Sequence, residues 1–315
     1  MQWLEDAWQR RDLPRPVVAT IGNFDGVHRG QSAILRQLVE RGRALGLPAV
    51  VVTFEPHPLT VVAPARAPGR LLSRRQKERL LAASRVDAVL EILFTPSFAA
   101  TPADAFVRAF LHETLAVREL YVGSRFVFGR GREGDLELLR RLGAELGFAA
   151  HGTDEVEFEG APISSSRIRR AVTEGRVADA GEMLGRVFAL HGTIVHGERR
   201  GRELGWPTMN LAPRQDVIPA RGVYVSEVRF AGEPARLHGV SNVGVRPTVS
   251  TGGKLVVETH ILDFSSDVYG QEAEVGFLER LRDERAFENV EALSNQIGQD
   301  VEQARAYFAC RPDSG

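Results

Sequence analysis

The stretch VVATIGNFDGVHRGQSAIL, residues 17–35, decides the fold of the first half, because an apolar run passes through a glycine-bearing turn into a helical pattern. Residues 17–22 are apolar enough to predict a short buried strand, and the apolar spacing after Ser32 predicts a helix to about Leu45. The turn between them carries glycines, an aspartate and His28. Such a turn presents backbone amides and a cation to an anion. The sequence therefore predicts an anion-binding site here.

The rest of the first half repeats the order of strand and helix. Helical patterns begin at two capping signals, Ser73 with Gln76 and Thr101 before Pro102. Three more apolar runs predict strands at residues 49–54, 87–94 and 119–123. Apolar strands that alternate with helices indicate an α/β domain with a Rossmann-like parallel sheet covered on both faces.

The pattern changes at about residue 187. Short, often alternating runs separated by glycine- or proline-bearing turns predict an antiparallel barrel or sandwich. After Phe287, a helical spacing predicts a C-terminal helix to about Phe308. We therefore expect two domains, residues 1–186 and residues 187–315, the second a β-barrel followed by a helix.

The composition limits the class of protein. The chain of 315 residues is 43% hydrophobic and 26% charged, with a formal net charge of −1, so no overall field attracts nucleic acid or membrane. A single cysteine, Cys310, excludes an internal disulfide and a cysteine-based zinc site. The first residues show no signal-peptide pattern, and no apolar run has the length of about 20 residues that spans a bilayer. We expect a soluble cytoplasmic protein.

Arginine dominates the basic residues. Of the 40 basic residues, Lys77 and Lys254 are lysines and the other 38 are arginines. A codon bias explains this more simply than function does. In either case, phosphate binding in this chain has to rely mainly on arginine.

One glycine motif has two interpretations. GRGREG at residues 129–134 fits G-x-G-x-x-G, the dinucleotide fingerprint. That fingerprint belongs in the first turn of its unit, whereas this segment follows several strands. We favour a glycine-arginine loop that closes over a polyanion.

Four segments of the first half carry groups that bind phosphate. GNFDGVHRG at 22–30 resembles the phosphate-binding turn of the nucleotidyltransferase superfamily, in which His28 could donate to an α-phosphate as charge develops. TFEPHP at 53–58, FGRGREGD at 128–135 and ISSSRIR at 163–169 follow at or near predicted strand ends. The serine run could instead only cap a helix.

In this order, the four segments resemble the FMN adenylyltransferase module of the prokaryotic bifunctional riboflavin kinase/FAD synthetase family. The second half continues the resemblance with GERRGRELGWPTMNL at 197–211, then GVSNVGVRPTV, VETHILDF and FLERLRDERAF. The resemblance covers residues 17 to 308 and implies that the chain phosphorylates riboflavin to FMN and adenylylates FMN to FAD with release of pyrophosphate.

The resemblance also implies site residues for the adenylyltransferase, with His28 as its catalytic residue. The expected ATP contacts are Gly22, Asn23, Phe24, Asp25, Gly26, His28, Gly30, Gln31, Ser164, Ser165 and Arg167. The expected contacts to FMN and its phosphate are His57, Arg125, Phe128, Gly129 and Asp135. FMN phosphate is already an anion, so this site needs cations and Mg²⁺ rather than a general base.

The kinase site implied by the resemblance contains Glu258 as general base for the riboflavin hydroxyl. Thr208 and Asn210 offer hard oxygen ligands for Mg²⁺. The expected ATP contacts of the kinase are Gly197, Gly201, Arg202, Gly205, Thr208 and Asn210.

Three positions depart from the family pattern. Gln31 replaces a second histidine, Arg125 replaces Asn or Asp, and Met209 replaces an alanine. The first two leave open an alternative in which the chain is a riboflavin kinase with a catalytically weak or regulatory N-terminal domain. An RNA-binding protein is a second alternative, which the balanced charge disfavours. We expect riboflavin, FMN, FAD and ATP as ligands, no nucleic acid or membrane partner, and a monomer or weak homo-oligomer.

Overall fold

The computed structural model describes residues 1–197, 205–246 and 254–311. These residues form two compact units, each described by itself below. The first unit comprises Met1–Pro68 and Arg74–Ser164, and the second comprises Gly69–Ser73 and Ser165–Gly315.

The first unit contains a six-stranded sheet in which every described strand pair is parallel, as the all-apolar strands predicted. The strand order is β1-β4-β3-β2-β5-β6. The strands are β1 Gln2–Leu4, β2 Val17–Ile21, β3 Ala49–Glu55, β4 Ala88–Leu93, β5 Val117–Gly123 and β6 Ala149–Thr153. A short hairpin, β7 Glu157–Phe158 and β8 Ala161–Pro162, ends the unit.

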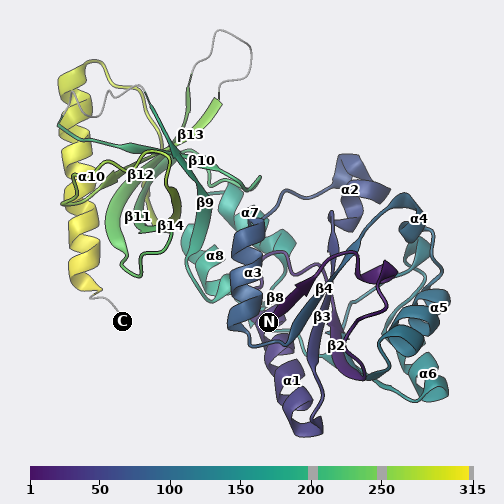
Figure 1. Cartoon of the computed structure of the whole chain (residues 1–315). Helices are drawn as coiled ribbons and strands as arrows, with labels where there is room; N and C mark the ends of the chain where they lie inside the picture. Colours follow the sequence, from purple (N-terminus) through teal and green to yellow (C-terminus); the bar gives the residue numbers. More distant parts are fainter. Residues whose placement is uncertain (198–204, 247–253, 312–315) are drawn as a thin grey trace. The chain divides into compact units, whose positions relative to one another are not determined.

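Helices cover both faces of this sheet. In Figure 1, α1 and α3 lie on one side of the strands, and α5 and α6 lie on the other. The core on the α5 and α6 side includes Phe106, Phe110 and Leu139, which pack with alternate residues of the central strands. The longer helices are α1 Arg29–Leu45, α3 Arg74–Ala83 and α6 Leu136–Leu146. The shorter pieces are η1 Ala7–Gln9, α2 Pro58–Val62, η2 Pro64–Arg66, α4 Pro96–Ala99, α5 Ala103–Phe106 with the π-helical η3 Val107–Thr114 that follows it directly, and η4 Arg130–Arg132.

The order of the strands positions the first candidate site. From β2 the sheet continues to β3 on one side and to β5 on the other, so the direction of winding reverses at the end of β2. Ligands of open α/β sheets bind outside the carboxyl ends of the strands at such a switch point. The turn at residues 22–28 leaves β2 at that place.

The second unit is a closed antiparallel barrel. Of the two architectures that the sequence predicted, the barrel is therefore confirmed and the sandwich is excluded. Its strand order is β10-β13-β12-β11-β14-β9, and β9 pairs with β10 to close it. The strands are β9 Phe188–Val195, β10 Met209–Pro213, β11 Gly222–Phe230, β12 Leu237–Arg246, β13 Lys254–Ile261 and β14 Glu272–Arg282. Two helices precede the barrel, α7 Ser165–Thr173 and α8 Val177–Leu184.

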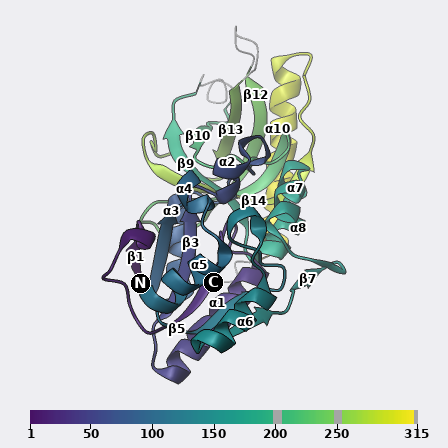
Figure 2. The ribbon, with the colours of Figure 1, turned by 90° about the vertical axis from the view of Figure 1, so that its right-hand side faces the viewer.

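The predicted C-terminal helix is α10, Val290–Cys310. Figures 1 and 2 show it along one side of the barrel, where it packs against β11 and β12. Val301 and Ala304 of the helix pack with Val223 and Val225 of the barrel. An ion pair between Arg282 of β14 and the buried Asp300, 2.7 Å apart, fixes the helix further.

Candidate functional site

Three loops of the first unit lie at one edge of its sheet. Residues 22–28 follow β2, Pro56 and His57 follow β3, and residues 124–128 follow β5. These three strands are parallel neighbours, so their carboxyl ends meet at the same edge. Two of the four segments singled out in the sequence, residues 22–30 and 53–58, therefore meet at this edge, and the third, residues 128–135, begins where the loop after β5 ends.

His28 begins the helix that faces this edge. Helix α1 begins at Arg29, three residues earlier than predicted, because His28 caps it. The His28 Nδ1 atom accepts from the backbone N–H of Gln31 at 3.4 Å, and the Gln31 Oε1 atom accepts from the backbone N–H of His28 at 3.2 Å. Since Nδ1 accepts, the neutral imidazole carries its proton on Nε2, which can donate to an anion.

Two glycines shape the turn near His28. A side chain at position 30 would lie 3.3 Å from the His28 ring, so the ring would have to shift by a few tenths of an ångström. Gly26 has φ 115°, which disfavours other residues. Phe24 and Val27 also have positive φ, 47° and 42°, although both are buried and one is β-branched. Burying these two apolar side chains offsets the strain, and strain of this kind is typical of ligand-binding turns.

The turn is joined to the loop after β3. The side-chain amide of Asn23 lies 3.1 Å from His57 Nε2. The Nδ1 atom of His57 accepts from the backbone N–H of Leu59 at 3.2 Å, so His57 caps α2 as His28 caps α1. An expected ATP contact and an expected FMN contact therefore touch.

The loop after β5 folds on itself. Phe128 and Gly134 exchange backbone hydrogen bonds, and a side chain on Gly129 would collide with Ala103 at 2.6 Å. Asp135 accepts from the backbone N–H of Leu138 at 2.9 Å and so caps α6. The contact of Asp135 with FMN stays a prediction.

Arg125 has a carboxylate partner. Its guanidinium pairs with Glu155 at 2.7 Å, and Ser124 Oγ donates to the same carboxylate at 3.2 Å. The Arg125 side chain is 75% exposed, so the pair is solvated and exchanges easily with another anion.

The serine segment lies where the two units divide. Ser164 is the last residue of the first unit, and Ser165 begins α7 of the second. The serine run thus begins a helix, as the alternative interpretation required. The ATP contacts of Ser164, Ser165 and Arg167 stay predictions.

The second candidate site is a row of polar side chains on the barrel. Asn210 of β10 lies directly opposite Glu258 of β13, which in turn lies opposite Asn242 of β12. Directly opposed residues project from the same face of a sheet with their Cβ atoms about 5 Å apart. Two amides and one carboxylate therefore share one face, the same face on which Val223 and Val225 contact α10.

Aromatic contacts hold the segment before β10. The His260 Nδ1 atom lies 2.9 Å from the Pro207 carbonyl oxygen, and the rings of Trp206 and His260 meet edge to face. Trp206 also donates to Ser294 of α10 at 3.3 Å. Thr208 follows directly, so barrel and helix together position it.

The glycines expected around the kinase ATP site differ in their surroundings. A side chain on Gly197 would reach 2.2 Å from the Asn210 amide nitrogen, so the backbone there lies against the Asn210 side chain. Gly205 has φ 82° in an open turn. Gly201 and Arg202 lie outside the described residues.

The donor set on the barrel fits a hard cation. Asn210 is buried, Thr208 precedes it by two residues, and a carboxylate faces it across the strands. Neutral and anionic oxygens with space for water and phosphate oxygens suit Mg²⁺. Within residues 1–197, 205–246 and 254–311, no group of three or more His, Cys, Asp or Glu side chains could hold a metal by itself.

Sequence reasoning missed three residues that the structure brings to these sites. Asn242 belongs to the motif GVSNVGVRPTV, but the sequence assigned it no role. The register between β12 and β13 shows that it lies opposite Glu258. Thr53 donates to the backbone carbonyl of Asn23 at 3.3 Å, and Lys77 donates to Thr53 at 2.8 Å. The signal that could have found Lys77 is its rarity in a chain that otherwise uses arginine.

Comparison with known protein families divides the chain close to the domain boundary that the sequence predicted. The model of the FAD synthetase family matches residues 10–167, and the model of the riboflavin kinase family matches residues 184–308. The predicted boundary at residue 186 is close to the start of the second match, while α7 and α8 group by contacts with the barrel. The boundary of the functional domains stays a prediction.

Curated relatives match nearly the whole chain. The bifunctional riboflavin kinase/FMN adenylyltransferase of Escherichia coli strain K12 is 44% identical over 291 residues, 92% of each chain. The protein of the same description from Pseudomonas fluorescens is 40% identical over 309 residues, 98% of each chain.

A solved structure supports the fold of the whole chain. A crystal structure described as a macrolide-efflux protein from Streptococcus pneumoniae aligns with a TM-score of 0.86 and 30% identity, covering 97% of this chain and 99% of that one. None of the helices in the described residues has the length and apolar character needed to cross a membrane. The two family matches and the curated relatives, which agree over the same residues, show that the chain belongs to the bifunctional riboflavin kinase/FMN adenylyltransferase family.

Proposed function

We propose that the two activities of this family, phosphorylation of riboflavin and adenylylation of FMN, are divided between the two units of the chain. The first unit adenylylates FMN at the carboxyl edge of its sheet. The second unit phosphorylates riboflavin at the polar row of Asn210, Glu258 and Asn242. The observation that carries the proposal is the register that aligns these three side chains on one face of the barrel.

In the kinase reaction, the Glu258 carboxylate removes the proton of the riboflavin 5′-hydroxyl. The hydroxyl oxygen then attacks the γ-phosphorus of ATP, and ADP leaves. A general base contributes about 10²–10⁴-fold to such a reaction. Glu258 suits this role because it lies on a hydrogen-bonded strand between two neighbours, which fixes its position.

In the adenylylation reaction, an oxygen of the FMN phosphate attacks the α-phosphorus of ATP and pyrophosphate leaves. No proton has to be removed, so the site needs only to hold two anions in line and to stabilise the charge that develops. His28 Nε2 and the backbone amides at the start of α1 supply these donors.

ATP-dependent transferases of this family use a divalent metal, and we propose Mg²⁺ held by Thr208 and Asn210 in the kinase site. Bound there, Mg²⁺ would neutralise charge on the transferring phosphates. Asn210 is buried, and the backbone at Gly197 lies against its side-chain amide. We further propose a cytoplasmic monomer or weak homo-oligomer with no nucleic acid or membrane partner.

The alternative, a riboflavin kinase with an inactive first domain, is not favoured, because the FAD synthetase match covers that domain. The experiment that tests both uses purified protein with riboflavin, Mg²⁺ and ATP, followed by chromatographic separation of the flavins. We expect FMN and then FAD, and no product after chelation of the metal. FMN alone, with no FAD even from supplied FMN, would contradict the proposal for the first unit.

A further inference from the structure

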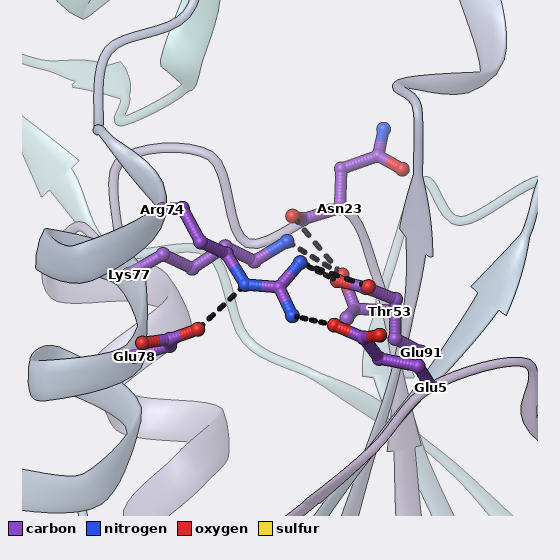
Figure 3. Close-up of polar contacts among 7 residues, drawn as sticks. All are labelled: Glu5, Asn23, Thr53, Arg74, Lys77, Glu78 and Glu91. Atoms are coloured by element: carbon purple, nitrogen blue, oxygen red, sulfur yellow. Dashed lines mark hydrogen bonds and ion pairs between the residues drawn. The ribbon is translucent and has the colours of Figure 1, made fainter. Parts of the chain in front are cut away.

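Lys77 lies beside the turn at residues 22–28 of the first unit, called the nucleotide turn below, although the mechanism above does not use this lysine. Figure 3 shows its side chain extending from helix α3 toward Thr53 and Asn23, while Arg74 of the same helix extends toward the glutamates around it. It is one of two lysines among 40 basic residues. Arginine cannot lose its charge in a protein, whereas a buried lysine can.

Arg74 fixes the helix from which Lys77 extends. Its guanidinium donates to both oxygens of the buried Glu91 at 2.8 Å, to Glu5 at 2.8 Å and to Glu78 at 2.6 Å. These contacts tie the first turn of α3 to β4 and to the segment after β1. Residues three apart on a helix project from the same side, so the anchor also sets the direction of Lys77.

The hydrogen bonds from Lys77 run in one direction to the nucleotide turn. The Nζ atom donates to Thr53 Oγ1 at 2.8 Å, and Thr53 Oγ1 lies 3.3 Å from the backbone carbonyl oxygen of Asn23. Within the described part of the chain, Thr53 is the single hydrogen-bond partner of the ammonium. Thr53 itself is fully buried, so water cannot replace either bond.

The protonation state of Lys77 determines which group donates in each of these two hydrogen bonds. An ammonium group can only donate, so Thr53 Oγ1 must accept from it and has its own proton left for the Asn23 carbonyl. A neutral amine can accept, so the Thr53 hydroxyl could turn toward it and leave the Asn23 carbonyl without its donor. Asn23 belongs to the turn that ends at His28 and contacts His57.

We propose that Lys77 is a positioning residue for adenylylation, whose ammonium makes Thr53 donate to the Asn23 carbonyl and so holds the nucleotide turn in its binding conformation. The proposal rests on the proposed function of the first unit. Lys77 touches neither substrate in this role and acts through Thr53.

The groups around Lys77 make its charge sensitive to pH. Glu91 of β4, Glu55 at the end of β3 and Asp25 of the turn favour the ammonium, while burial and Arg74 of α3 oppose it. Burial is the largest of these effects and lowers the pKa of Lys77 to about 8. The hold on the turn is therefore strongest well below this pH and is lost as pH rises through it.

The first test is the pH profile of kcat/KM for ATP in FAD formation from FMN, since this quantity reports groups of the free enzyme. We expect the wild type to decline with a midpoint near pH 8. Lys77→Arg should lack this decline, because its donor-only group does not titrate. Thr53→Ser should keep it. Thr53→Val should lack the decline, and its kcat/KM for ATP at pH 7 should be lower than that of the wild type by about 3- to 10-fold, the effect of one lost hydrogen bond. Equal profiles for the wild type and Lys77→Arg would overturn the proposal.

The second test does not depend on catalysis. Hydrogen exchange at pH 7 should be faster for the backbone amides of residues 22–28 in Thr53→Val and Lys77→Met than in the wild type. Amides within β5, a central strand of the same unit, should exchange as in the wild type and serve as the folding control. Unchanged exchange at residues 22–28 would overturn the proposal. A wild type that makes no FAD from FMN would instead count against the proposed function, and the exchange result would still decide the role of Lys77.

Discussion

The two candidate sites are built differently. At the sheet edge of the first unit, the expected ligand contacts lie on turns after the strands, and two histidines cap helices. On the barrel, Asn210, Asn242 and Glu258 lie within strands and are aligned by register. The first site therefore depends on backbone conformation, and the second on strand pairing.

The chemistry of the two reactions explains this difference. Adenylylation joins two anions and needs donors and space for phosphates, which helix starts and glycine turns supply. Phosphorylation of an alcohol needs a base held against one hydroxyl, and a strand holds a side chain more rigidly than a loop does. If this comparison is right, substitutions at each site should affect one reaction and spare the other.

The largest effect is expected for Glu258→Gln. The amide cannot take the hydroxyl proton, so FMN formation from riboflavin should fall by about 10²–10⁴-fold. FAD formation from supplied FMN should stay near the wild-type rate. Initial rates of both reactions, measured by flavin chromatography on one preparation, check this.

A matched control is Glu279→Gln, the same substitution at an exposed glutamate of β14. It should leave both reactions unchanged. Equal loss of both reactions in Glu258→Gln would mean that the division between the two units is wrong.

The next largest effect is expected for His28→Asn. Asparagine is a good N-cap residue, so the start of α1 should be kept while the imidazole donor is lost. Adenylylation should fall by about 10²-fold in kcat, the size found for removing one donor to a developing charge. Far-UV circular dichroism and the melting temperature of the variant measure whether the first unit is folded, and the kinase rate should be unchanged. Wild-type adenylylation would show that His28 only caps the helix.

Much of the fold could be predicted because the central strands of the sheet are apolar along their length and those of the barrel often alternate. Strand β1 was missed because three residues at the edge of a sheet give no periodicity, and its pairing with β4 depends on tertiary contact. Strand β10 was read as a motif rather than a strand, since glycine and proline precede it. These segments are specified by their neighbours in space.

The site residues also differ in whether local sequence or contacts between distant residues specify them. The turn at 22–30 could be found from the sequence, because glycines and a histidine between a strand and a helix already indicate an anion site. The roles of Asn242 and Lys77 could not, because each depends on a contact with a residue at least 16 positions away, Glu258 and Thr53 respectively. Spacing along the chain does not contain that information.

A smaller effect would sharpen the account of Gln31, which departs from the family pattern. Gln31→Glu keeps an acceptor for the His28 backbone N–H and adds a negative charge that favours the helix start. The same charge repels phosphate, so the melting temperature should hold or rise while kcat/KM for ATP in adenylylation falls roughly fivefold.

Gln31→Ala is the matched variant for that prediction. It removes the acceptor without adding charge, so the melting temperature should fall slightly, with a smaller loss of kcat/KM than in Gln31→Glu. Thermal unfolding and adenylylation kinetics on both variants give the comparison. If Gln31→Ala lost more activity than Gln31→Glu, the cap rather than the charge would govern the site.

The smallest effect is expected away from both sites, at the ion pair of Arg41 in α1 with Glu119 in β5. Arg41 Nε donates to Glu119 Oε2 at 2.9 Å, and the Tyr121 hydroxyl donates to the same oxygen at 2.7 Å. The Arg41 guanidinium, aided by Tyr121, lowers the pKa of Glu119 from 4.5 to about 2 against the opposing effect of burial. A lowered carboxyl pKa stabilises the fold above the unfolded-state pKa, and the contribution is lost as pH falls from about 4.5 toward 2.

Arg41→Met should therefore lower the melting temperature by about 2–4 °C at pH 7, the shift expected for one modest interaction. The difference from the wild type should shrink as pH falls below about 4.5, because the wild-type carboxylate loses its advantage there. Both reactions should be retained, since the pair lies between α1 and β5 and not at the turn. A difference in melting temperature that stayed constant from pH 7 to pH 3 would show that Arg41 stabilises by packing of its methylene groups rather than by its charge.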